Sequence, residues 1–163
     1  MAEAAAGRLR PAVTLALAGG LSLFAVLLIH EVLAFGTQPH DLIAPAGAAC
    51  AGPPCLTMGT VVTGLVAKAI GAGAVFAVIG AVWTTGAARW TIAGGFFALQ
   101  YLWSLIGIAS GYRGHFGTTW TWWAPFAELL WHPVTTPALL LAGLAGCLGL
   151  DRLARQGRPG PAA

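Results

Sequence analysis

The chain has 163 residues, of which 58% are hydrophobic and only 8% are charged, and its mean hydropathy is +0.79. A soluble globular domain carries about 25% charged residues, so this chain has too few charges to cover a water-soluble globule. The net charge of +3 does not indicate nucleic-acid binding, because the basic residues stand at the ends of apolar runs and not in a patch interleaved with aromatic residues. We therefore expect a single all-α domain whose surroundings are the lipid bilayer.

Four apolar runs are long enough to cross a bilayer, which needs about 20 residues. We predict a bundle of four transmembrane helices within residues 11–150, with spans of about 11–35, 60–85, 90–110 and 133–150. Residues 1–10 precede the first span. A cleaved signal peptide is the alternative for this start, but the apolar run is longer than a signal core. Residues 151–163 form a tail rich in glycine, proline and alanine, for which we predict disorder.

The distribution of basic residues predicts the orientation of the spans. Arg89 lies in the short turn between the second and third spans, and five more arginines lie in the two terminal segments: Arg8, Arg10, Arg152, Arg155 and Arg158. Arg113, alone or with Lys68, lies on the other side. Because cytoplasmic loops carry an excess of lysine and arginine, we predict a multi-pass protein of the cell membrane with both termini cytoplasmic.

The segment between the third and fourth spans, residues 112–133, is predicted to form a partly helical outer loop at the membrane interface. It contains four of the seven tryptophans, whose rings favour the headgroup region. Prolines interrupt it, and His132 directly precedes one of them. Two arrangements fit: a short helix over 121–131, a break and then a span from about Thr135, or one long helix kinked near His132. We favour the first, because Thr135 or Thr136 can cap a helix whose first turn contains Pro137.

The first outer loop, residues 35–59, contains Cys50 and Cys55 among several glycines and prolines. In an oxidising outer compartment such a pair favours a local disulfide, and two free thiols are the alternative. Cys147 lies near the inner end of the fourth span, where a small buried packing role is the simplest interpretation.

All four histidines fall at or beyond the outer boundary of this topology, together with three of the five acidic residues. Imidazole and carboxylate groups bind metal ions and relay protons. We predict that four of them form one site: His30, Glu31, Glu128 and His132. The i, i+4 spacing of Glu128 and His132 suits a helical pair, whereas the adjacent His30 and Glu31 point about 100° apart. The alternative is that polar residues are simply tolerated at the interface.

Lys68 is the second candidate residue. If the second span begins near Thr60, the ammonium group lies about a third of the way into the hydrocarbon and needs a partner such as Glu31 or Glu128. If the span begins near Lys68 itself, this is an ordinary boundary lysine.

Two patterns predict contacts between the helices. Small residues in the second span permit close approach of a neighbouring helix: Ala67, Gly71, Gly73 and Gly80. Hydrogen-bonding residues on neighbouring turns of the third span indicate a face that points into the bundle: Gln100, Tyr101 and Ser104.

These observations leave three functional hypotheses open. The first is a binding or transport protein whose outer pocket holds a divalent metal ion, a proton, a polar small molecule or a lipid head group. The second is an accessory subunit that packs against other membrane subunits or against a second copy of the chain. The third is an outer-face enzyme that uses a metal, a quinone or a haem, with His30 and His132 as axial ligands of the haem.

Overall fold

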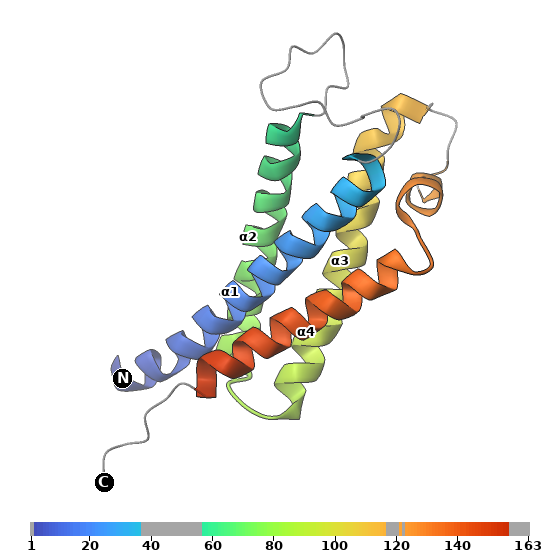
Figure 1. Ribbon diagram of the computed structural model, residues 1–163. Coiled ribbons are helices and arrows are strands. Elements are labelled where there is room, and N and C mark those ends of the chain that lie inside the picture. The colour runs from blue at the N-terminus through green and yellow to red at the C-terminus, as the bar shows by residue number, and fades with distance from the viewer. Residues whose placement is uncertain (1, 37–56, 117–120, 122, 157–163) are drawn as a thin grey trace.

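The structure is a computed structural model that describes residues 2–36, 57–116, 121 and 123–156. Every element in this part of the chain is helical (Figure 1). The elements follow one another as α1 (Ala2–Glu31), a π-helical turn η1 (Val32–Gly36), α2 (Met58–Val82), α3 (Ala87–Phe116), a second π-helical turn η2 (Phe126–Leu130) and α4 (Thr135–Gln156).

Four of these helices are long and apolar enough to cross a membrane, which confirms the prediction of a four-span, all-α protein. The candidate spans are Leu9–Ala34, Met58–Val82, Ala87–Gly111 and Thr135–Gln156. Helix α4 continues six residues beyond residue 150, where its span was predicted to end. This extension is held to the bundle by Asp151, which forms an ion pair with Arg89 of α3. Cys50 and Cys55, and with them the predicted disulfide, lie outside the described residues.

Helix α1 is the central helix of the bundle. It packs against both α2 and α4, and half of its span is buried, compared with 17% of the span in α4. The start of α1 and the end of α4 lie at the same end of the bundle (Figure 1). We call this end, where α1 begins and α4 ends, the terminus end. The opposite end, where α1 ends and α4 begins, is the loop end.

Glycines allow α1 and α2 to pack closely. A Cβ atom placed on Gly80 would lie only 2.5 Å from the Pro11 carbonyl oxygen, and one on Gly73 would lie 3.4 Å from the Ala16 oxygen. The predicted role of these two glycines is therefore confirmed. Ala67 and Gly71 are exposed instead, because they lie on other faces of α2, away from α1.

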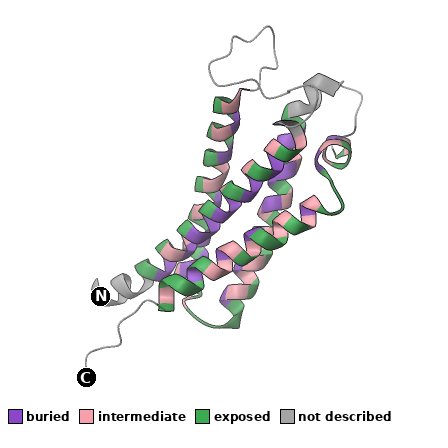
Figure 2. Ribbon diagram, viewed as in Figure 1, coloured by how far each residue is buried: buried purple, intermediate pink, exposed green. Residues whose placement is uncertain are grey.

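Buried residues line the inward faces of all four long helices (Figure 2). Large side chains such as Leu27, Phe76 and Phe97 form the apolar core. In α3, Tyr101 and Ser104 are buried and Gln100 is half-buried. This confirms that the predicted polar face of the third span points into the bundle.

The connection before α4 follows the broken arrangement that the prolines favour. The turn η2 ends at Leu130, Trp131 is extended, and α4 begins at Thr135. The residue that caps α4 differs from the prediction: the His132 ring accepts hydrogen bonds at Nδ1 from the backbone N–H groups of Val134 (3.2 Å) and Thr135 (3.1 Å). The Thr136 hydroxyl oxygen in turn accepts from the His132 N–H at 3.0 Å. His132 is therefore fixed by the helix start that it caps.

Candidate functional site

The structure divides the four predicted site residues between two pockets. His30, Glu128 and His132 line a pocket of about 260 Å³ at the loop end, which we call the loop-end pocket. Glu31 lines a separate cavity of about 130 Å³ together with Lys68, which we call the lysine cavity. The division follows from helix geometry, because the adjacent residues His30 and Glu31 project about 100° apart around α1.

His30 forms the buried floor of the loop-end pocket and is only 2% exposed. Its Nε2 atom lies 2.9 Å from the Leu130 carbonyl oxygen, and its Nδ1 atom lies 2.6 Å from the Tyr101 hydroxyl. A carbonyl oxygen can only accept, so Nε2 carries a proton and donates. In the neutral imidazole Nδ1 is then the acceptor for the Tyr101 hydroxyl. Both ring nitrogens are therefore engaged.

The same network can hold a charged imidazole without losing a partner. The Tyr101 hydroxyl also lies 3.4 Å from the Thr136 carbonyl oxygen. If His30 were protonated, Nδ1 would donate to the hydroxyl oxygen of Tyr101, whose own proton would turn to Thr136. The Leu130 carbonyl accepts a further hydrogen bond from the Thr136 hydroxyl at 3.3 Å. The network thus joins α1, α3, η2 and α4 beneath the pocket.

The rim of the loop-end pocket offers one hydrogen-bond acceptor and one donor. Glu128, in η2, is exposed and supplies a carboxylate. His132 is also exposed, and its Nδ1 atom is occupied as an acceptor by the start of α4. In neutral His132 the proton is therefore on Nε2, which donates. Trp131 and Leu129 add apolar surface to the wall.

The predicted metal site is not assembled in the part of the chain that the structure describes. No group of three or more histidine, cysteine, aspartate or glutamate side chains within it could hold a metal ion. His30 and Glu31 lie in different pockets, and the hydrogen bonds of His30 leave neither ring nitrogen open to a metal or to the iron of a haem. The side chains of His40, Asp41 and His115 lie outside the described residues.

Lys68 lies in the interior of α2. Helix α2 begins at Met58 and is capped by reciprocal hydrogen bonds between Thr57 and Thr60. With a rise of about 1.5 Å per residue, Lys68 lies about 15 Å from the start of α2. Of the two predicted partners, Glu31 lines the same cavity, whereas Glu128 lines the loop-end pocket.

A second polar network, at the terminus end, is centred on Arg89 and was not predicted from the sequence. Arg89 and Asp151 are both completely buried. Arg89 Nη2 lies 2.7 Å from Asp151 Oδ1, and Nε lies 3.3 Å from Oδ2. The remaining guanidinium N–H groups donate to three carbonyl oxygens: Pro11 at 2.9 Å, Gly80 at 3.1 Å and Trp83 at 2.9 Å. All five N–H donors of the guanidinium are thereby used.

Two more side chains, Thr14 and Arg155, bind Asp151, and Arg155 also binds the connection that follows α2. The Thr14 hydroxyl donates to Asp151 Oδ1 at 3.2 Å, and Arg155 Nε lies 3.0 Å from Oδ2. Arg155 also donates to the Thr84 carbonyl oxygen at 2.7 Å. Two sequence signals agree with this network. Asp151 is one of only two acidic residues on the side predicted to carry most of the arginines, the other being Glu3. It also has the i, i+4 spacing to Arg155 typical of a helical ion pair.

The chain was also compared with protein families, curated proteins and solved structures, and none of them matches it. The four helices indicate a multi-pass membrane protein built as a helical bundle.

Proposed function

We propose that this membrane protein binds a small polar molecule or a lipid head group in the loop-end pocket, at the outer face of the cell membrane. One observation carries the proposal: three residues from separate segments of the chain, His30, Glu128 and His132, line one pocket. The distribution of arginines, which favours cytoplasmic termini, supports the outward orientation of this end.

The chemistry of the rim favours a ligand that has both a cationic group and an acceptor group. The Glu128 carboxylate suits an ammonium group, and the neighbouring Trp131 indole offers a face to a cation. The Nε2 proton of His132 suits a phosphate or carboxylate oxygen. A zwitterionic head group such as phosphoethanolamine offers an ammonium group to Glu128 and a phosphate oxygen to His132. His30 has the supporting role, because its bond to the Leu130 carbonyl holds η2, and with it Glu128, over the pocket.

Binding of phosphoethanolamine to the purified protein in lipid nanodiscs tests the proposal. We expect Glu128→Gln and His132→Ala each to weaken the affinity about tenfold, because each removes one charge-assisted hydrogen bond. Thr63→Ala is the matched control, since Thr63 is exposed on α2 and its hydroxyl bonds only to the Gly59 carbonyl of its own helix. Equal affinities in all four proteins, or no binding by the parent protein, would contradict the proposal.

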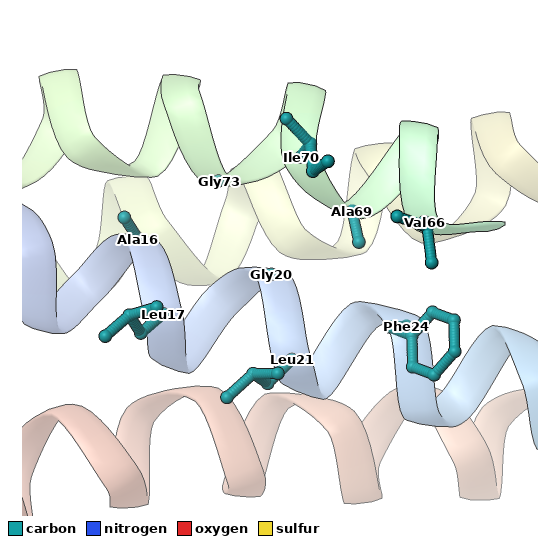
Figure 3. Close-up of a pocket in the computed structure, with 9 residues that line it drawn as sticks. All are labelled: Ala16, Leu17, Gly20, Leu21, Phe24, Val66, Ala69, Ile70 and Gly73. Carbon is teal, nitrogen blue, oxygen red and sulfur yellow. The ribbon is translucent and has the colours of Figure 1, made fainter. Parts of the chain in front are cut away.

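An accessory subunit of a larger membrane complex is the second candidate function. It is favoured by an apolar groove of about 400 Å³ between α1 and α2, with Gly20 and Gly73 beneath it and Leu17, Phe24 and Ile70 around it (Figure 3). Only 28% of the span in α2 is buried within the chain. Another apolar helix could therefore cover this face. Co-purification of a second membrane protein that is lost in a Gly20→Leu variant would support this function.

A further inference from the structure

Lys68 is the only ionisable residue in α2. It lies about 15 Å from the start of the helix and about 21 Å from its end, so it is far from both boundaries of a helix that is otherwise apolar. A charge at this depth is costly unless the protein, water or a ligand provides it with a partner.

The Lys68 side chain is half-buried and points toward α3. Its Nζ atom lies 3.3 Å from the position that a Cβ on Gly107 would occupy. Nζ therefore reaches the lysine cavity, which is lined by residues of α2, α3 and the end of α1. The space beside two glycines of the lining is open, since a Cβ on Gly64 or on Gly111 would meet no atom within 4 Å.

No hydrogen bond or ion pair reaches the Lys68 ammonium from any residue that the structure describes. An ammonium group has three donors to satisfy. Glu31, which is 4% exposed, also lines this cavity. The cavity thus places the N–H donors of the Lys68 ammonium beside apolar walls that include Leu65 and Ile108.

From this geometry we infer that the lysine cavity binds a membrane-soluble molecule whose head carries an oxygen acceptor and whose tail is apolar. The head accepts hydrogen bonds from Lys68, and the apolar walls contact the adjoining part of the tail. Two sources share this chemistry: the carboxylate of a long-chain fatty acid and the carbonyl of an isoprenoid quinone. The volume of about 130 Å³ admits a compact head. Because each water occupies about 30 Å³, a few waters bound to Nζ are the alternative occupant.

Binding measurements with both probes on the purified protein in phosphatidylcholine nanodiscs test this inference. The probes are palmitate labelled with ¹³C at the carboxylate and a benzoquinone with an isoprenoid tail. Lys68→Met keeps the length of the side chain and removes its donors, so we expect binding about tenfold weaker or worse. Gly64→Leu keeps Lys68 but places a large side chain at a lining position of the cavity, and we expect it to weaken binding equally. Thr91→Ala is the matched control and should bind like the parent protein, since Thr91 is exposed on α3 and its hydroxyl bonds to the Ala87 carbonyl of its own helix.

The results distinguish three occupants of the lysine cavity: a fatty acid, a quinone, or water alone. Binding of palmitate alone assigns a fatty acid, binding of the quinone alone assigns a quinone, and binding of both assigns the shared acceptor. If neither probe binds the parent protein more tightly than it binds Lys68→Met and Gly64→Leu, waters alone occupy the cavity and the inference is overturned. The test is independent of the proposed function, since it uses no residue of the loop-end pocket.

Discussion

Arg89 and Asp151 form a buried side-on ion pair, in which two nitrogens of the guanidinium face the two oxygens of the carboxylate at 2.7 Å and 3.3 Å. The same guanidinium donates to the Gly80 carbonyl at the end of α2, where backbone carbonyls lack helical partners. It also donates to the Pro11 carbonyl of α1. One side chain of α3 therefore connects all four long helices at the terminus end.

Removing either member of this pair should strongly destabilise the protein. Arg89→Ala leaves a buried aspartate without its principal partner and removes one hydrogen bond from each of three carbonyls. Breaking a buried ion pair in this way costs about 3–5 kcal/mol. The thermal unfolding temperature in detergent, followed by circular dichroism, measures the loss. Replacing both residues, as Arg89→Met with Asp151→Leu, should cost less than Arg89→Ala alone, because neither charge of the completely buried pair then stays behind without the other. A double variant that is less stable than both single variants would contradict this explanation.

The hydrogen bond between Tyr101 and His30 should contribute to the free energy of unfolding, and this contribution should be lost when either residue is replaced. Tyr101→Phe removes only the hydroxyl, and leaving Nδ1 of the buried His30 without a partner should cost about 1–3 kcal/mol. In a His30→Phe background the same change should cost much less, because the partner is already absent. Unfolding temperatures of the parent, the two single variants and the double variant measure the energetic coupling between Tyr101 and His30. Additive losses would show that the two side chains are energetically independent.

Gly80 and Gly71 form a matched pair for testing the contact between α1 and α2. Gly80→Ala places a Cβ atom 2.5 Å from the Pro11 carbonyl oxygen and 2.8 Å from the Ala12 Cα, so the helices must separate, at a cost of about 1–3 kcal/mol. Gly71→Ala meets no atom within 4 Å and should be neutral or slightly stabilising, since alanine favours the helix. Comparable unfolding temperatures for the two variants would contradict the close packing.

The number of helices could be predicted from the sequence because each span is a long apolar run bounded by charges or prolines. The break before α4 was also predictable, since a proline restricts the backbone on both of its sides. Tyr101 and Ser104 could be assigned to an inward face because polar groups in a span avoid lipid. These predictions depend on local chemistry alone.

The arrangement of the polar residues could not be predicted in the same way, because it depends on contacts between distant segments. The positive-inside rule treats Arg89 as a boundary residue and says nothing of a buried partner 62 residues away. The common position of His30 and Glu31 at the outer boundary suggested that they share a site, whereas their angular separation on α1 places them in different pockets. The capping role of His132 depends on a backbone break whose exact position the sequence did not give.

The orientation of the bundle stays a prediction, and the accessibility of single cysteines measures it. In a variant without native cysteines, a cysteine at Thr121, exposed at the loop end, should react with a membrane-impermeant maleimide added to intact cells. A cysteine at Thr85, exposed in the connection at the terminus end, should react only after permeabilisation. The opposite labelling pattern would place the loop-end pocket on the cytoplasmic side and contradict the outward-facing proposal.

The proposal that Glu128 and His132 form one binding site at the loop-end pocket is tested most directly by a double-mutant cycle on the affinity for phosphoethanolamine. The four proteins are the parent, Glu128→Gln, His132→Ala and the double variant, each measured by calorimetry in nanodiscs. Residues that hold one ligand together are non-additive, so we predict that the double variant loses less binding free energy than the sum of the two single losses. Losses that simply add, or affinities that do not change in any variant, would contradict a shared site.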